Sequence, residues 1–318
     1  MRKTNTMIVL TVLLSLQMSG CFFIKADLSL VSKAEPLQEQ VIAGQGKDKI
    51  LLMDITGMIT TEESSTALGV SRELGMVAVV REQLDRARSD GNVKALVLRI
   101  NSPGGGVTAS DMLYHELKQF KSETGVKVIA HFTDAGASGA YYTALAADRI
   151  TAQPTTITGS IGVTMLRVDA TGLMQKIGIQ ALEISSGPEK GMGSPFRAVT
   201  PEEKKIFQGM INDLYGRFVD LIVAERKLPV EKVRQLADGR IFTSRDAREA
   251  GLIDDVGYLE DALGKAKELA GIQQASIISY IRPGDYRPNI YSMNMNLFNV
   301  NLGELSRPGM KFTYLWMP

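Results

Sequence analysis

The chain has 318 residues, of which 44% are hydrophobic and 22% are charged. This composition excludes the intrinsically disordered and fibrous classes of protein. Lys and Arg number 36 against 35 Asp and Glu, and this balance lacks the basic excess of nucleic-acid-binding proteins, so we expect no nucleic-acid partner. A single cysteine excludes an internal disulfide framework, and only two histidines argue against a multi-histidine metal site.

The N-terminus has the layout of an export signal. A positively charged start precedes an apolar run over residues 7–16, and Ser19-Gly20 stand directly before Cys21. This small pair before the single cysteine resembles a bacterial lipoprotein signal, in which the cysteine is acylated. An uncleaved transmembrane anchor over residues 7–24 is the alternative. In both cases we expect a membrane-anchored protein of the bacterial cell envelope, with its folded domain outside the cytoplasm.

Composition changes divide the rest of the chain. Residues 22–47 are polar and predict a tether between the anchor and the domain. Regular apolar patterning then predicts one domain over residues 48–282. From Pro283 the sequence is asparagine-rich with scattered apolar residues, so we expect residues 283–318 to form an extended C-terminal tail. With residues 1–21 as the signal or anchor, these four parts account for the whole chain.

Short apolar runs alternate with amphipathic stretches along the predicted domain. In the first half we expect strands at 50–53, 95–100 and 126–130, and helices at 77–87, 109–120 and 140–147. In the second half we expect a helix near 173, a strand at 181–184, a loop at 185–195, helices at 201–226, 229–237, 244–250 and 260–270, and a last strand at 276–281. Repeated strand–turn–helix units predict a parallel sheet in an α/β architecture.

Gly136-Ala137-Ser138-Gly139-Ala140 lies between a predicted strand and a predicted helix. The segment nearly matches a nucleophile elbow, in which small neighbours let a serine occupy a sharp turn at a helix N-terminus. A tight turn that needs small residues for packing alone is the alternative.

A serine nucleophile needs a base. Both His115 and His131 precede Ser138, whereas the α/β-hydrolase order places the histidine after the serine, so a triad of that type is disfavoured. Lysine is the remaining common base, provided that its pKa is lowered. Lys190 stands out because it lies in a glycine- and proline-containing loop, although a solvated surface lysine is the ordinary interpretation of such a position.

Several motifs in one order resemble the signal peptide peptidase (SppA-type) serine proteases, in their short single-domain form. The resemblance covers residues 49–281, with Ala140 and Ser244 as small-for-small departures. The motifs are Asn101-Ser102-Pro103-Gly104-Gly105-Gly106, Ala137-Ser138-Gly139 with Tyr141-Tyr142, Gly159-Ser160-Ile161-Gly162, Lys190 with Gly193-Ser194-Pro195-Phe196-Arg197, Asp238-Gly239-Arg240-Ile241-Phe242 and Gly251-Leu252-Ile253-Asp254.

The resemblance implies the fold shared by Clp proteases and crotonases, with a single catalytic domain. It also implies roles, in which Ser138 is the nucleophile, Lys190 its general base, and Ser160 the residue that orients the lysine amine. The amides of Gly105 and Gly139 would stabilise the oxyanion. No metal or organic cofactor is implied. Short chains of the family assemble into a homo-oligomeric ring or dome in which the serine and the lysine can come from adjacent subunits.

Together with the export signal, the resemblance therefore implies a membrane-tethered serine endopeptidase that hydrolyses apolar peptides such as remnant signal peptides. We expect such a peptide to lie in an extended conformation beside residues 102–106, with small or aliphatic residues before the cut. Two alternatives share the same sequence features. A catalytically inactive membrane-tethered scaffold would keep the glycines, and a crotonase-like acyl-CoA enzyme would keep the fold and the oxyanion amides.

Overall fold

The computed structural model describes most of the chain, namely residues 36–65, 72–292 and 312–317. Residues 36–64 and 74–318 form one compact unit, and residues 1–35 and 65–73 form another, of which only the ends of two short strands are described. Cys21 and the expected signal or anchor lie outside the described residues. The predicted catalytic and oxyanion residues all belong to the first of these units.

Among the described residues, nine strands form one mostly parallel sheet. From β13 to β12 all neighbours on the main path run parallel, while β1 and β11 pair antiparallel at two edges. The strands are β1 (Gln38–Gly44), β13 (Ser276–Ile281), β2 (Lys49–Thr56), β5 (Val93–Ser102), β7 (Lys127–Ala137), β8 (Arg149–Ala152) and β12 (Asp255–Val256) in spatial order, with β9 (Ile157–Gly159) and β11 (Ile241–Thr243) continuing beside the end of β7.

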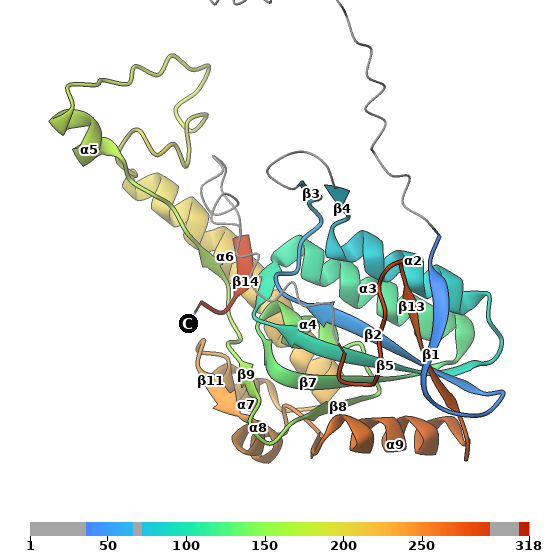
Figure 1. Cartoon of the computed structure of the whole chain (residues 1–318). Coiled ribbons are helices and arrows are strands. Elements are labelled where there is room, and N and C mark those ends of the chain that lie inside the picture. The colour runs from blue at the N-terminus through green and yellow to red at the C-terminus, as the bar shows by residue number, and fades with distance from the viewer. Residues whose placement is uncertain (1–35, 66–71, 293–311, 318) are drawn as a thin grey trace, which may run out of the picture. The chain divides into compact units, whose positions relative to one another are not determined.

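Strand β2 shows how the sheet separates two hydrophobic layers. Successive side chains of a strand point to opposite faces. Leu51 and Met53 therefore pack into the layer beneath helices α2 (Met76–Arg88) and α3 (Val107–Thr124), whereas Ile50 and Leu52 pack against helix α9 (Leu259–Ala270). Figure 1 shows α2 and α3 on one side of the sheet and α9 on the other. Burial on both faces explains why residues 50–53 of this strand are all apolar.

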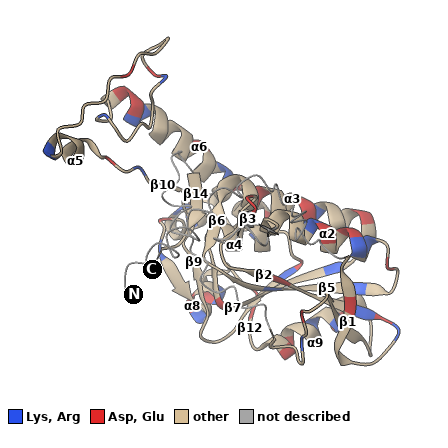
Figure 2. Cartoon of the chain, turned by 45° about the horizontal axis from the view of Figure 1, so that its top comes forward, with Lys and Arg blue, Asp and Glu red and all other residues tan. Residues whose placement is uncertain are grey.

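Ion pairs join the two helices that cover the first face. Arg81 of α2 contacts Glu116 of α3 at 2.8 Å, and Arg88 contacts Glu123 at 2.8 Å. Figure 2 shows acidic and basic residues interspersed along the ribbons of these helices. No helix of the described residues is both long enough and apolar enough to cross a membrane.

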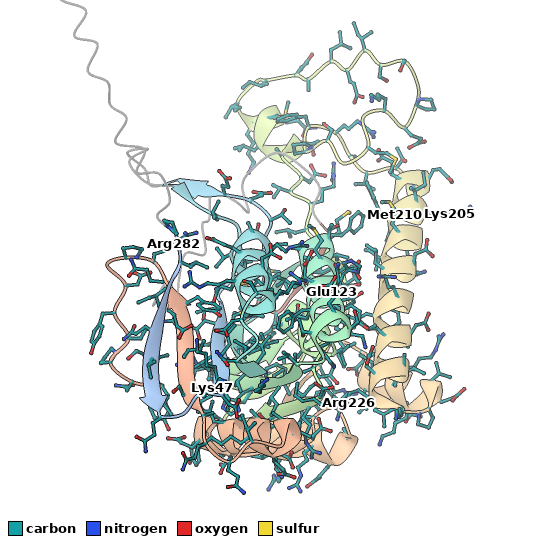
Figure 3. The ribbon with its side chains drawn as sticks, turned by 90° about the vertical axis from the view of Figure 1, so that its right-hand side faces the viewer. Lys47, Glu123, Lys205, Met210, Arg226 and Arg282 are labelled. Atoms are coloured by element: carbon teal, nitrogen blue, oxygen red, sulfur yellow. The ribbon has the colours of Figure 1, made fainter. Side chains whose placement is uncertain are left out.

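Helix α6 (Pro201–Arg226) starts where the sequence predicts, because Thr200 and Glu203 form a capping box and Pro201 stands at the first helical position. Its C-terminal end is fixed by Arg226, whose guanidinium contacts Asp254 at 2.9 Å. Figure 3 shows Arg226 at that end and Lys205 and Met210 towards the opposite end. The remaining helices are α4 (Gly139–Ala144), α5 (Thr171–Lys176), α7 (Val230–Leu236) and α8 (Ser244–Ala250).

The α/β class predicted from the sequence is confirmed, and the main strands and long helices lie where expected. The predicted tether is wrong over residues 38–44, which form β1 and pair with β13 at the edge of the sheet. One predicted strand is also wrong. Residues 181–184 carry no regular structure, and Leu182 and Ile184 are 88% and 90% exposed. Apolar alternation alone does not make a strand when no neighbouring strand is available to accept its backbone hydrogen bonds.

A second, smaller sheet lies beside the turn that carries Ser138. It contains β6 (Gly104–Gly106), β14 (Phe312–Leu315) and β10 (Thr164–Met165), and β14 pairs antiparallel with both neighbours. The end of the C-terminal tail is therefore extended, as the sequence predicts, but it is also packed into the domain. Tyr314 is fully buried.

Candidate active site

Ser138 occupies a strained turn between β7 and α4. Its backbone has φ 53° and ψ −115°, a conformation that costs energy for any residue other than glycine and that clusters at functional sites. Its amide donates to the Gly159 carbonyl at 2.7 Å, and its own carbonyl accepts from the Tyr142 amide at 2.9 Å. Ser138 is 1% exposed, so the turn fixes its hydroxyl in an enclosed position.

The residue after Ser138 is a glycine because a larger side chain at position 139 would clash with α3. A Cβ at this position would lie 2.3 Å from the Ser110 hydroxyl oxygen of α3. The small residue therefore lets the start of α4 approach α3 closely. This close approach is the physical reason for the glycine in the sequence Ser138-Gly139.

Ser160 directly follows β9, just as Ser138 directly follows the neighbouring strand β7. Strand β9 runs parallel to the end of β7 with Gly159 opposite Ala137, so Ser138 and Ser160 each leave the same end of adjacent strands. Ser160 also has a positive φ, 49°, and its amide donates to the Arg240 carbonyl at 2.7 Å. Of the residues the structure describes, only Ser138, Ser160 and Lys227 are non-glycine residues with positive φ. The topology thus brings together two of the predicted site residues.

The amides of Gly105 and Gly139 also meet. Ile59 holds β6 in place, because its amide donates to the Gly104 carbonyl and its carbonyl accepts from the Gly106 amide, each at 2.9 Å. The position that a Cβ of Gly139 would take is 3.1 Å from the Gly105 amide nitrogen. The two predicted oxyanion donors therefore lie close together, beside the Ser110 hydroxyl of α3.

The C-terminal strand lies beside these two glycines. Tyr314 is opposite Gly105 in the β14–β6 pairing, and its carbonyl oxygen is also 3.1 Å from the position of a Gly139 Cβ. The Trp316 amide extends the pairing by donating to the Pro103 carbonyl at 2.8 Å. On its other edge β14 pairs with β10, where Thr313 is opposite Thr164. An extended segment thus lies between two strands, and its Tyr314 carbonyl lies beside Gly104 and Gly139.

An aromatic cluster encloses the Tyr314 side chain. Its ring stacks on Tyr142 with centroids 5.2 Å apart and lies 4.8 Å from the ring of Phe218 on α6. Burial raises the pKa of the Tyr314 phenol, which stays protonated and donates to the Leu214 carbonyl at 2.9 Å. Tyr142 is held in turn by a 2.6 Å hydrogen bond from its hydroxyl to Asp111. The surroundings of Tyr314 accept a large aromatic side chain with a polar tip.

Lys190 is not brought to Ser138 within one chain. It is exposed, and no hydrogen bond or ion pair joins its ammonium group to any described residue. It belongs to residues 166–200, none of which is buried and which join β10 to α6. Figures 1 and 2 show α5 beyond the N-terminal end of α6, away from β7 and β9. Of the five predicted catalytic and oxyanion residues, the fold gathers four.

Neither histidine approaches Ser138. His115 is exposed on α3. His131 is fully buried on β7, where its Nδ1 lies 2.8 Å from the Thr151 hydroxyl and its Nε2 has no hydrogen-bond partner among the described residues. Burial lowers the pKa of His131 to about 4. The imidazole is therefore a neutral core group at physiological pH.

This burial predicts a loss of stability in mild acid. The folded-state pKa of about 4 lies below the ordinary 6.5, so the unfolded chain gains a proton first as the pH falls below 6.5. The free energy of unfolding should fall by about 2–3 kcal/mol between pH 7 and 4.5 from this residue. Urea unfolding of wild type and His131→Asn at both pH values tests it. Equal pH dependence in the two proteins would show that His131 does not contribute.

No cluster of three His, Cys, Asp or Glu side chains suited to a metal ion occurs in the part of the chain that the structure describes.

The sequence analysis did not predict the aromatic cluster around Tyr314. Tyr142 belongs to a recognised motif, but Phe218 and Tyr314 join it from α6 and from the chain end. Only the apolar spacing of residues 312–316 signalled that the tail could be buried.

Comparison with known sequences identifies relatives of this chain. The profile of peptidase family S49 matches residues 120–273. A Methanocaldococcus jannaschii protein provisionally named as a protease is 41% identical over 197 residues, which are 62% of this chain and 63% of that protein. An Enterococcus faecium protein provisionally named as signal peptide peptidase SppA is 34% identical over 246 residues, which are 77% of this chain and 71% of that protein.

Among solved structures, the chain is similar to a point mutant of ClpP1 from Listeria monocytogenes. The TM-score is 0.43 and the sequence identity is 19%, over 67% of this chain and 94% of that chain.

Proposed function

Because this chain belongs to peptidase family S49 and is a serine-type peptidase, we propose that it hydrolyses extended apolar peptides with Ser138 as nucleophile and Lys190 as general base. The single observation that carries the proposal is the position of β14. An extended segment lies antiparallel between β6 and β10, with Tyr314 opposite Gly105 and its carbonyl beside Gly139. A substrate strand bound in the same way would present a peptide carbonyl beside Ser138.

In the proposed reaction the Ser138 hydroxyl attacks that carbonyl carbon. The amides of Gly105 and Gly139 stabilise the negative oxygen that forms, and each such donor contributes about 3–4 kcal/mol in other serine proteases. Both amides are held by rigid strands and by the start of α4, so little reorganisation is needed when the charge develops. Lys190 takes the serine proton in its neutral form and returns it to the leaving amine.

The lysine that serves Ser138 comes, in this proposal, from a neighbouring subunit. Two observations support a shared site. Lys190 is exposed and distant from Ser138 within its own chain, and its segment presents an unpartnered apolar surface that a second copy would cover. The exposed apolar residues of this surface are Leu166, Val168, Leu173, Ile177, Ile179, Leu182 and Ile184. A head-to-tail contact of this kind closes into a ring, in line with the expected homo-oligomeric ring or dome.

We place the enzyme at the membrane of a bacterial cell envelope, with its domain outside the cytoplasm and its N-terminus attached at Cys21 or by an apolar anchor. The apolar run before Cys21 supports this location. Remnant signal peptides are the proposed substrates, because they are apolar and unfolded and lie in the same membrane. The name of the relative from Enterococcus faecium agrees with that substrate class.

The inactive-scaffold alternative would need the loss of a catalytic group, whereas Ser138, Ser160, Lys190 and both glycines are all present. An acyl-CoA enzyme would need room for a nucleotide beside the oxyanion amides. A strand paired on both edges fits a peptide substrate better.

Peptide libraries test the substrate preference. The aromatic cluster that holds Tyr314 predicts cleavage after Tyr or Phe in preference to Ala by on the order of 10²-fold in kcat/KM, because a large buried ring contributes a few kcal/mol. This differs from the preference for small or aliphatic residues expected from the sequence. Phe218→Ala should reduce the preference for aromatic residues, while Phe196→Ala, at an exposed position outside the cluster, should not. Equal cleavage after Ala and Tyr would contradict the assignment.

A further inference from the structure

Residues 166–200 hold Lys190 without a hydrophobic core. None of these residues is buried, and α5 within them has no buried side chain. Apolar packing therefore contributes little to the geometry of the loop, and polar contacts must hold it. Those contacts converge on Arg197.

Arg197 joins the loop to the first turn of α6. Its guanidinium contacts the carboxylate of Glu203, which is 1% exposed. The same carboxylate accepts from the Thr200 amide at 2.9 Å, and the Glu203 amide donates to the Thr200 hydroxyl at 3.1 Å. The hydrogen bond from the Thr200 amide and the Arg197 guanidinium lower the pKa of the Glu203 carboxyl and keep it ionised. One end of the Arg197 contact is thus fixed rigidly to a long helix.

Arg197 is also linked, through Glu183, to Gly191, the residue that follows Lys190. Its Nε lies 3.3 Å from a carboxylate oxygen of Glu183. That carboxylate lies directly against Gly191, where a Cβ would be only 2.0 Å from a carboxylate oxygen. A continuous chain of contacts therefore runs from α6 through Glu203, Arg197 and Glu183 to Gly191.

A second arginine closes the base of the same loop. Arg167 donates to the carbonyls of Ser194 and Arg197, and the Ala170 amide donates to the Pro195 carbonyl at 2.8 Å. Within the loop, the amides of Lys190, Met192 and Ser194 each donate to the carbonyl three residues earlier, at 3.1–3.2 Å. The loop is a series of turns, and its two ends are tied together.

We propose that Glu203, Arg197 and Glu183 form a positioning bridge that sets the orientation of Lys190 relative to α6. The inference rests on the proposed function, in which Lys190 is the general base. A base acts only when its nitrogen lies within hydrogen-bond reach of the serine proton, and a shift of about 1 Å can reduce the rate by 10²-fold. The bridge supplies the rigidity that a loop without a core lacks. Arg197 is suited to it because a planar guanidinium contacts two carboxylates at once.

Two variants disturb the bridge in different ways. Arg197→Met removes the cation, and Gly191→Ala displaces the flexible Glu183 carboxylate without touching Arg197. Each should lower kcat by about 10–100-fold and leave KM within about 2-fold, because the strands that bind the peptide are untouched. Arg197→Lys should restore little, because an ammonium group lacks the planar fork.

Matched controls separate positioning from general damage. Gly187→Ala lies in the same loop with open space around its Cβ position, and Arg245→Met removes an exposed arginine from α8. Both should keep wild-type kcat. Wild-type kcat in Arg197→Met and Gly191→Ala would overturn the bridge. A loss of kcat in Gly187→Ala as large as that in Arg197→Met would also overturn it. So would a decrease in kcat/KM that comes entirely from a higher KM. Activity in Lys190→Ala would instead refute the dyad, so the two failures are distinguishable.

Discussion

Mixing the Ser138→Ala protein with the Lys190→Ala protein should restore peptide hydrolysis that neither variant shows alone. Each single variant loses one half of the proposed dyad, and losses of about 10⁴- to 10⁶-fold are usual when a nucleophile or its base is removed. In a mixed ring, a subunit with an intact serine can lie beside a subunit with an intact lysine. Random assembly of equal amounts gives about a quarter of the sites in that arrangement, hence about a quarter of wild-type activity.

The experiment needs oligomers that contain both variants. The two variants are therefore co-expressed with different tags, and the mixed oligomers are purified through both tags. A peptide carrying a fluorophore and quencher measures the rate. The matched control is a double variant with both substitutions in one chain, co-expressed with the Ser138→Ala chain, which leaves no intact serine. Activity in the Lys190→Ala protein alone would refute its role as base. Two inactive single variants without recovery on mixing would place both groups in the same chain.

Local patterns were sufficient to predict most of the fold. The apolar run at 95–100 and the small residues around Ser138 describe a strand followed by a strained turn, and both follow from neighbours in the sequence. Ser138 and Ser160 meet because parallel strands β7 and β9 end together. The alternation of strands and helices predicts a parallel sheet but no strand at 157–159, so the place of Ser160 in the site was expected only from the family resemblance.

Other features depend on contacts that the sequence does not encode locally. The sequence of residues 181–184 is typical of a strand, but none of the strands in the described part of the chain pairs with it. The position of Lys190 depends on polar contacts within its loop and, in our proposal, on a second subunit. The role of Tyr314 arises from pairing with a strand more than 200 residues earlier, and no short-range pattern reports such a pairing. Long-range and intersubunit contacts therefore account for what was missed.

The C-terminal strand occupies the place proposed for substrate, so its removal should increase activity towards added peptides. Tyr314 is fully buried, and β14 is paired on both edges. A segment tethered to its own site competes at an effective concentration on the order of 1 mM, which a free peptide at lower concentration cannot match. A chain that ends at residue 311 should therefore show an apparent KM lower by at least about 10-fold, with kcat unchanged.

Two further proteins decide whether occupancy is the cause. Tyr314→Ala keeps the backbone pairing but removes the ring from the aromatic cluster, so its apparent KM should fall between those of wild type and the truncated chain. Removing only residues 317–318, beyond the hydrogen bond between Trp316 and Pro103, should leave KM at the wild-type value, because the strand remains bound. An unchanged KM in the chain that ends at residue 311 would show that β14 does not compete with substrate. A fall in kcat together with higher exposure of the core would show instead that β14 stabilises the domain. The geometry favours competition, because the strand contributes one buried ring while it covers the glycine amides, the Ser138 turn and β10 together.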